Sequence, residues 1–165
     1  MGRNIKHREE LLAMLDETVA EAVEFFGSTD EQAYDGYQTA REVLSHLAFW
    51  HSAYVAIVWA LATKREPPLF AGTFAELNAR AAQELCAEPM QALAERLAHR
   101  QKQLAKALRR LPDWSIDFPV KTGGAFESVE ERVLDIERHI RNHMCRMQRA
   151  LKREIRGTRL ERVMV

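Results

Sequence analysis

Cysteine is scarce in this sequence, and the scarcity limits the kinds of protein it can be. Only two of the 165 residues are cysteine, Cys86 and Cys145. Small secreted domains with little core depend on several disulfides, and two distant cysteines cannot supply such a framework. We therefore expect both to be reduced thiols in a cytoplasmic protein. Cys145 lies two residues after His143, on another helix face, so we expect it to pack and not to bind metal.

Long apolar runs are also missing. The most apolar stretch, residues 53–62, is about half as long as a helix that crosses a bilayer. The N-terminus is charged and helix-like, without the apolar centre of a signal peptide. The sequence contains no phosphate-binding loop, dinucleotide fingerprint or nucleophile turn, and Gly123–Gly124 indicates only a loop hinge. These absences disfavour a membrane protein and the commonest nucleotide-binding and hydrolase folds.

Neither sign of charge is in excess. Lys and Arg together number 24, as do Asp and Glu, which disfavours broad electrostatic capture of nucleic acid or anionic membrane. The C-terminal segment is locally basic, and such a run is more typical of a solvated helix face than of a nucleic-acid site. We expect no nucleic-acid or membrane partner. The basic residues of this segment are Arg146, Arg149, Lys152, Arg153, Arg156, Arg159 and Arg162.

Helical periodicity is what the sequence has in abundance. Apolar residues recur every three or four positions, and no period-two alternation is long enough for a sheet. Three helix starts carry a capping box, in which a hydroxyl and a Glu three residues later each satisfy a backbone N–H. These are Thr39/Glu42, Thr73/Glu76 and Ser128/Glu131. The expected fold is all-α: a four-helix bundle with a long crossover, containing a short extra helix, between main helices two and three.

The expected boundaries follow from the breakers. Main helices are predicted over residues 5–26, 39–64, 89–111 and 128–157, and the short helix over 73–86. Residues 112–126 read as an irregular connection, because Pro119 and Gly123–Gly124 interrupt them. We expect a single domain over 1–157 and a C-terminal tail over 158–165. Residues 55–61 are apolar nearly all round, which places the second helix at the centre of the bundle or at a subunit interface.

Two histidines four residues apart, His139 and His143, lie one turn apart on the last helix, at a spacing at which two imidazoles can bind one metal. Both fall on or beside the apolar stripe. A buried neutral histidine needs a partner for each ring nitrogen. A shared metal satisfies both rings, but ordinary hydrogen-bonded core histidines fit this pair as well.

A third histidine favours the metal. His46 lies between Val43 and Trp50 on the inner face of the second helix, so three imidazoles are predicted to converge on one core. Three nitrogen ligands with an open fourth position are typical of a catalytic or ligand-exchanging metal, whereas a structural zinc site is usually closed by a further ligand. Three imidazoles suit zinc, nickel, copper or iron.

The other histidines are not expected to bind this metal. His51 lies about 140° around the helix from His46, and we expect it at a pocket rim or an interface. His99 points away from its apolar stripe, and His7 lies near the helix start.

No general base is evident in the sequence. The pair is not a metalloprotease motif, because Ile140 stands where that motif needs Glu. Asp135, one turn before His139, is a candidate to act as a base or to orient the His139 ring, and pairing with an arginine fits it equally well. Glu42 and Glu137 are expected to cap helices and to pair with arginines.

Pocket-forming residues are harder to assign. Arg100 and Gln101 interrupt the apolar stripe of the third main helix, which marks either a pocket or the edge of the stripe. Trp50, Tyr54 and Trp114 either line an aromatic pocket or belong to the core.

These residues together resemble the DinB-like, or YfiT-like, helical metalloproteins. The match lies in residues 39–51, read as Thr-Ala-Arg-Glu-Val-Leu-Ser-His-Leu-Ala-Phe-Trp-His, and in His139-x-x-x-His143. The phrase from His46 to His51 and the segment 74–80 look most like the ClbS/DfsB branch. The resemblance implies a four-helix bundle in which His46, His139 and His143 bind zinc, nickel or a similar ion. It also implies a homodimer.

The resemblance leaves the function open. Some relatives are transferases or isomerases that use a low-molecular-weight thiol, and ClbS hydrolyses a strained ring in a genotoxin. The first hypothesis is therefore a metal-dependent hydrolase or thiol-dependent transferase acting on a small molecule. The second is a non-enzymatic protein that binds a small molecule or metal during stress. The third is a purely structural helical dimer in which the histidines are ordinary core residues.

Overall fold

The computed structural model describes residues 2–85 and 87–163 and contains five helices and two short strands. In chain order these are α1 (Gly2–Ser28), α2 (Ala40–Ala62), α3 (Phe74–Leu85), α4 (Met90–Arg110), β1 (Asp117–Phe118), β2 (Glu127–Ser128) and α5 (Val129–Val163). The predicted all-α fold is confirmed. Cys86, which we expect to be a reduced thiol, lies outside the described residues.

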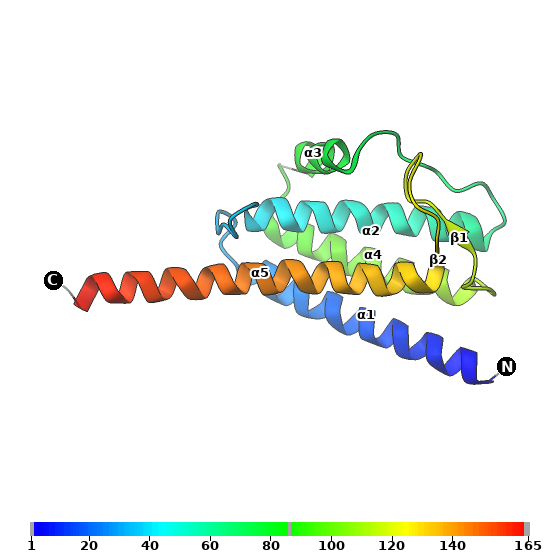
Figure 1. The fold of residues 1–165 in the computed structure, drawn as a ribbon, viewed down its shortest axis with the longest axis horizontal. Coiled ribbons are helices and arrows are strands. Elements are labelled where there is room, and N and C mark those ends of the chain that lie inside the picture. Colours follow the sequence, from blue (N-terminus) through cyan, green and yellow to red (C-terminus); the bar gives the residue numbers. More distant parts are fainter. Residues whose placement is uncertain (1, 86, 164–165) are drawn as a thin grey trace.

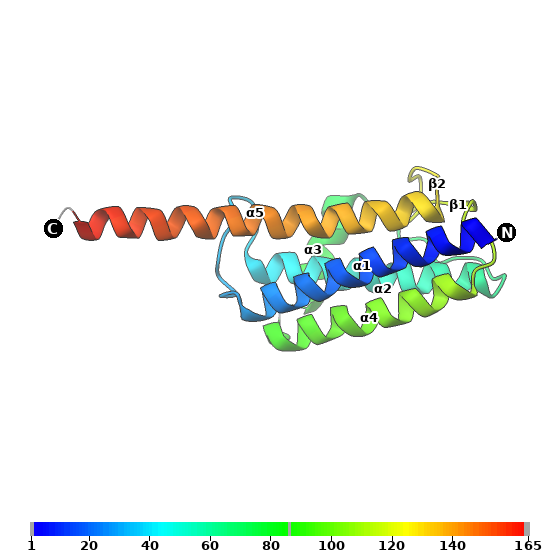
Figure 2. The same cartoon turned by 90° about the horizontal axis from the view of Figure 1, so that it is seen from below.

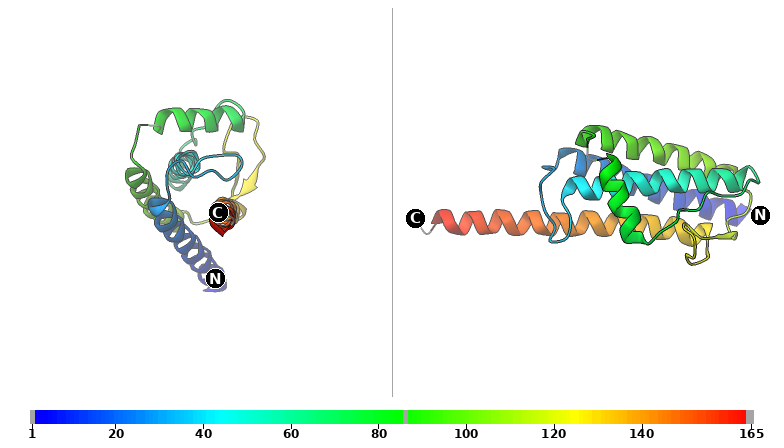
Figure 3. Two further views of the ribbon diagram at one scale, coloured as in Figure 1. Left: turned by 90° about the vertical axis from the view of Figure 1, so that its left-hand side faces the viewer. Right: turned by 90° about the horizontal axis from the view of Figure 1, so that it is seen from above.

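Helices α1, α2, α4 and α5 form the four-helix bundle (Figure 1). Seen end-on, α2 and α1 occupy opposite corners, and α4 and α5 occupy the other two (Figure 3). Helix α4 packs against both α1 and α2, and α1 packs against α5. The backbones of α2 and α5 approach each other least closely of the four neighbouring pairs. The space between these two helices is therefore filled by side chains, and the candidate site lies there.

All three predicted capping boxes form. Thr39 accepts the backbone N–H of Glu42 and Glu42 accepts that of Thr39, which fixes the N-cap of α2 seven residues before His46. The same reciprocal bonds open α3, between Thr73 and Glu76, and α5, between Ser128 and Glu131. Because a cap satisfies backbone groups that a helix end leaves unpaired, these local signals define where α2, α3 and α5 begin.

Helix α3 lies across the outside of α2 (Figures 1 and 3). Its apolar stripe, Leu77, Ala81 and Leu85, is buried, and its contacts are with α2. The crossover before α3 is joined to the loop that follows α4, because the backbone N–H of Thr122 donates to the carbonyl of Phe70 at 2.9 Å. Asn78, on the next turn of α3 after the cap, is thereby held against α2.

The connection between α4 and α5 is more ordered than the sequence indicates. Its ends pair as a two-stranded antiparallel ribbon, with Asp117 opposite Ser128 and Phe118 opposite Glu127. Strands of two residues carry no alternation that a sequence pattern could show. The buried Arg132 holds the ribbon from α5 by donating to the carbonyl of Ala125 at 2.7 Å and by pairing with Glu127.

Helix α5 leaves the bundle as a projecting rod (Figures 1 and 2). The sequence predicts that this helix frays after Gly157, but α5 continues through Gly157 to Val163. A single glycine costs a helix only about 1 kcal/mol, which is too little to end it. The boundary between domain and tail at residue 157 stays a prediction.

The apolar character of α2 follows from its central position. Within the described residues α2 is the one helix long and apolar enough to cross a membrane, yet 67% of its apolar window is buried inside the bundle. Burial against α3 and α4 therefore accounts for its hydrophobicity.

Candidate metal centre

The structure brings together the three histidines that the sequence singles out. One ligand atom from each of His46, His139 and His143 lies within 4.8 Å of the others. The Nε2 atoms of His46 and His139 are 2.7 Å apart, and the ring centroids of His139 and His143 are 4.5 Å apart. His46 and His143 are buried, and His139 is exposed. The predicted convergence is confirmed, and metal binding by these residues stays a prediction.

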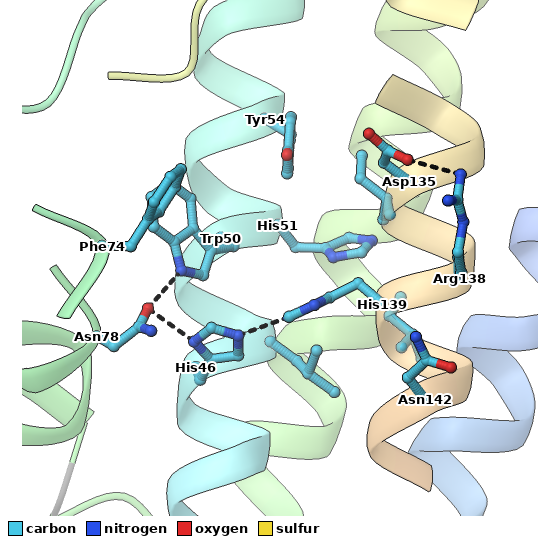
Figure 4. A pocket seen from close by; sticks show the side chains of 13 residues that line it. His46, Trp50, His51, Tyr54, Phe74, Asn78, Asp135, Arg138, His139 and Asn142 are labelled. Carbon is cyan, nitrogen blue, oxygen red and sulfur yellow. Dashed lines mark hydrogen bonds and ion pairs between the residues drawn. The ribbon is translucent and has the colours of Figure 1, made fainter. Parts of the chain in front are cut away.

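Local helix geometry explains the arrangement. His139 and His143 are one turn apart on α5, so their rings lie one above the other on the side that faces α2. His143 continues the buried stripe of Ile136 and Ile140, and His46 meets the pair from α2. The pocket view shows His46 and His139 pointing at each other across the gap between the two helices (Figure 4).

Asn78 on α3 fixes the orientation of His46. The Nδ1 atom of His46 is 2.9 Å from Asn78 Oδ1, and the indole N–H of Trp50 donates to the same oxygen at 2.8 Å. Because an amide oxygen only accepts, Nδ1 of His46 carries the proton and its Nε2 presents a lone pair to the other histidines. This is how outer groups orient metal-binding imidazoles. The sequence offers no periodic signal for Asn78, since it depends on how α3 crosses α2.

His143 has a different partner. Its Nδ1 atom is 2.9 Å from Arg146 Nη2, and Arg146 Nε donates to the buried carboxylate of Asp35 at 2.6 Å. Asp35 also accepts the backbone N–H groups of Tyr37 and Gln38, each at 2.8 Å. Sequence reasoning assigned Arg146 to a solvated face and gave Asp35 no role. Here the two residues connect the loop before α2 to the site.

A guanidinium can only donate, so the bond from Arg146 places the lone pair of the neutral His143 ring on Nδ1. A metal bound at Nδ1 would take that lone pair, and a metal bound at Nε2 would leave a proton on Nδ1. In either case the Arg146–His143 hydrogen bond and a metal on neutral His143 exclude each other. Metal binding therefore requires the guanidinium of Arg146 to move away from the His143 ring. Its positive charge would then remain paired with the carboxylate of Asp35.

Burial keeps the site histidines neutral. It lowers the pKa of His46 from 6.5 to about 4, with the charge of His139 as the next cause, and that of His143 to about 3, with His139 and His46 adding to the shift. The pKa of His139 is also lowered, first by the burial of its ring beside the other histidines, although the residue as a whole is exposed, and then by Arg146. Neutral rings have a free lone pair, which is the form that binds a metal.

A pocket of about 430 Å³ opens beside His46 and His139, and His143 is not among the residues that line it. His46 and His139 line it, together with Trp50, Tyr54, Phe74 and Asn78. The predictions that Trp50 and Tyr54 line a pocket fit this wall, and burial raises the pKa of Tyr54 to about 12, so its hydroxyl stays protonated. Trp114, by contrast, is a core residue at 2% exposure.

Asp135 and Gln101, both predicted to lie in or near the site, bond residues other than the three histidines, and the prediction for Gln101 needs correction. Asp135 lines the pocket, but its carboxylate accepts from Arg138 at 2.8 Å, and no hydrogen bond joins it to His139 among the described residues. A pairing three residues along the helix competes with the ring one turn away. Gln101 lies outside this pocket and instead bonds His51 at 2.9 Å. Glu42 and Glu137 take their expected roles, in the α2 cap and in a 2.6 Å pair with Arg141.

The donor set fits a divalent metal. Three neutral imidazoles from two helices, with a pocket beside them, correspond to a three-ligand site with an open position. Nitrogen ligands of a tetrahedral zinc, with bonds of about 2.0–2.1 Å, lie about 3.3 Å apart, so His46 and His139 need move only slightly from their hydrogen-bonded spacing.

Comparisons with known proteins support the fold. No protein-family model matches the sequence, and no curated protein matches it. Among solved structures, the crystal structure of the mycothiol-dependent maleylpyruvate isomerase matches with a TM-score of 0.70 at 17% sequence identity. A variant of that isomerase with a histidine replaced by alanine matches with the same TM-score at 16% identity.

Each match covers 85% of this chain and 60% of the isomerase chain. This chain therefore corresponds to about three fifths of that protein. The isomerase has the DinB/YfiT-like fold, and the likeness confirms this fold for the present chain. The ClbS/DfsB branch stays a prediction.

Metal titration tests the ligand set directly. We expect one equivalent of Zn²⁺ per chain, and at least about a 100-fold loss of affinity in His143→Ala, since even residues that only orient a ligand are worth about 10–100-fold. The exposed His99 on α4 gives the matched control His99→Ala, which should bind as the wild type does. Elemental analysis and competition with a chromogenic chelator measure both. Equal binding by His143→Ala would favour the reading of the histidines as core residues.

Arg146→Gln is expected to bind Zn²⁺ more tightly than the wild type, by about tenfold, because the variant removes a competing donor and a nearby positive charge. Arg149→Gln removes the same charge from an exposed position of α5 and should change the affinity much less. The same chelator competition compares the two. Weaker binding by Arg146→Gln would mean that Arg146 supports metal binding.

Acid should destabilise the metal-free protein. Burial lowers the pKa of His51 from 6.5 to about 4, so between these values the unfolded chain binds a proton that the folded protein does not. Its contribution is complete above pH 6.5 and is lost as the pH falls toward 4, by about 2 kcal/mol between pH 7 and 5. Urea unfolding at the two pH values measures the change, with His99→Gln as the control. A free energy of unfolding that stays constant from pH 7 to 5 would contradict the buried neutral state.

Proposed function

We propose that this protein is a divalent-metal-dependent enzyme that uses a low-molecular-weight thiol to act on an electrophilic small molecule. The observation that carries the proposal is the convergence of His46, His139 and His143 within 4.8 Å beside an open pocket. A purely structural site would need no adjoining cavity and is usually closed by a fourth protein ligand.

The residues divide the work between them. His46, His139 and His143 would hold the ion, which supplies Lewis acidity and so lowers the pKa of a thiol or water bound to it. Asn78 keeps the Nε2 lone pair of His46 directed at the site. The aromatic side chains of Trp50 and Phe74, whose ring centroids lie 5.6 Å apart, form an apolar wall that shields a bound small molecule from water.

The pocket has few groups that could act as a general base, which favours a thiol over water as the nucleophile. Of the residues that line the pocket, Asp135 is the one carboxylate, and it is paired with Arg138. A free thiol has a pKa near 8.5, far below that of water at about 15.7, so a metal can generate the thiolate with little help from a base. The similar fold belongs to an isomerase described as mycothiol-dependent, which agrees with this choice.

Zinc or nickel is the metal we propose, because three imidazoles are ligands that both metals accept.

We also propose that the protein is a homodimer and a member of the ClbS/DfsB branch. The half-buried apolar residues Val55 and Trp59, one turn apart on α2, supply a surface for the second subunit.

Assays with defined probes test the reaction class. Protein loaded with Zn²⁺ or Ni²⁺ is incubated with glutathione or cysteine and, in turn, an α,β-unsaturated diacid and an activated ester. We expect thiol-dependent turnover, which falls at least about 100-fold in His139→Ala and in the metal-free protein and is retained in His99→Ala. Mass spectrometry identifies the products.

The other outcomes contradict the proposal in distinct ways. Turnover of the ester without thiol would indicate a hydrolase. Probe that binds and is recovered unchanged would indicate a binding protein. Activity that survives removal of the metal would exclude the three-histidine site as the reactive centre.

A further inference from the structure

A hydrogen-bonded network of three side chains crosses the core of the bundle behind the metal pocket. His51 on α2 is 2% exposed, and its Nε2 atom is 2.9 Å from Gln101 Oε1 on α4. The amide Nε2 of Gln101 donates to Asp16 Oδ1 on α1 at 2.7 Å. We call these three residues the Asp16–Gln101–His51 network.

The network joins two concave surfaces lined by different helices, one by α2, α3 and α5 and the other by α1 and α4. His51 lines the pocket beside the metal site, and in the pocket view its ring lies between the α2 backbone and His139 (Figure 4). Asp16 and Gln101 line a groove of about 560 Å³ between α1 and α4. A charged group in that groove is thereby connected to an uncharged ring in the pocket.

The polarity of the network has one consistent direction. An ionised carboxylate only accepts, so Asp16 requires the NH₂ group of Gln101 to face it. The amide oxygen of Gln101 must then face His51, and an oxygen there requires the proton of the ring to sit on Nε2. The other nitrogen of His51, Nδ1, consequently carries the lone pair.

The ring of His51 keeps this form at neutral pH. Burial lowers the pKa of His51 to about 4, and its hydrogen bond to Gln101 only partly offsets the effect. A neutral ring with its proton fixed on Nε2 can only accept through Nδ1. Since His51 lines the pocket and its Nε2 is bonded to Gln101, Nδ1 is the nitrogen left for a molecule in the pocket.

Stability alone gives little reason for such a network. Burying polar side chains costs free energy that their hydrogen bonds roughly return, and well-packed apolar residues of similar volume often serve as well. Apolar residues at the buried positions 51 and 101 would complete the core between α2 and α4. What they would not provide is a hydrogen-bond acceptor with a fixed direction in the pocket wall.

We propose that His51 is a ligand-positioning residue, which accepts a hydrogen bond at Nδ1 from an O–H or N–H group of the small molecule in the pocket, and that Asp16 and Gln101 set its tautomer. The pocket therefore selects molecules that carry a donor over equally shaped ones that do not. The proposal rests on the proposed function only in that both place a small molecule in this pocket.

Nuclear magnetic resonance of the metal-free protein tests the tautomer. Long-range ¹H–¹⁵N spectra should show Nδ1 of His51 as the nitrogen without a proton. Asp16→Asn removes the acceptor-only group, so the amide of Gln101 can turn over and a second tautomer of His51 should appear. Glu17→Gln makes the same charge change at an exposed neighbouring position of α1 and should leave the spectrum unchanged. A wild-type ring with its proton on Nδ1, or an Asp16→Asn spectrum identical to the wild type, would overturn the proposal.

A matched pair of probes tests the ligand preference. Phenol and toluene have nearly the same shape, and only phenol donates a hydrogen bond. We expect phenol to shift the Nδ1 signal of His51, and the preference for phenol over toluene to fall by about tenfold or more in His51→Leu. Failure of phenol to bind, or binding that leaves Nδ1 unshifted, would overturn the proposal. Neither probe needs metal or thiol, so these results stand apart from the fate of the proposed reaction.

Discussion

The hydrogen bonds that buried imidazoles make govern the centre of this molecule. The backbones of α2 and α5 stay apart, and histidines occupy the intervening space where other neighbouring helices use aliphatic side chains. Each ring is held by a different helix or loop: His46 by Asn78 of α3, His143 by Arg146 and, through it, by Asp35 of the loop before α2. The positions of α3 and of that loop are thus coupled to the chemistry between α2 and α5.

The outer partners do not act alike. Asn78 leaves Nε2 of His46 ready to bind an ion, whereas Arg146 occupies the Nδ1 lone pair of His143. The rings of His46 and His139 share a hydrogen bond, and the ring of His143 bonds the guanidinium of Arg146. A metal must replace those bonds, and its net affinity is what remains after their loss. The site therefore combines ready-made ligands with a built-in competitor.

Sequence reasoning works where the physics is local and stops where it is not. The three capping boxes, the helix count and the inward face of His46 depend on residues three or four apart, and all appear as predicted. Asn78, Arg146 and the link from Gln101 to His51 depend on how helices cross, which no periodicity records. For Asp135 the sequence leaves two partners open: its spacing to His139 is suitable, but Arg138 lies equally near and carries a full charge, and Arg138 is the partner that it bonds. Polar residues in a predicted core face, such as Gln101, were the usable signal.

The open space between α2 and α5 has a mechanical consequence. Helix α5 packs mainly against α1, and the His46 ring of α2 meets the His139 and His143 rings of α5 in the space between these helices. An ion bound by histidines of both helices would cross-link α2 to α5. Amide protons on the central turns of α5 should then exchange with solvent more slowly in the loaded protein, while those of the α2–α4 interface barely change.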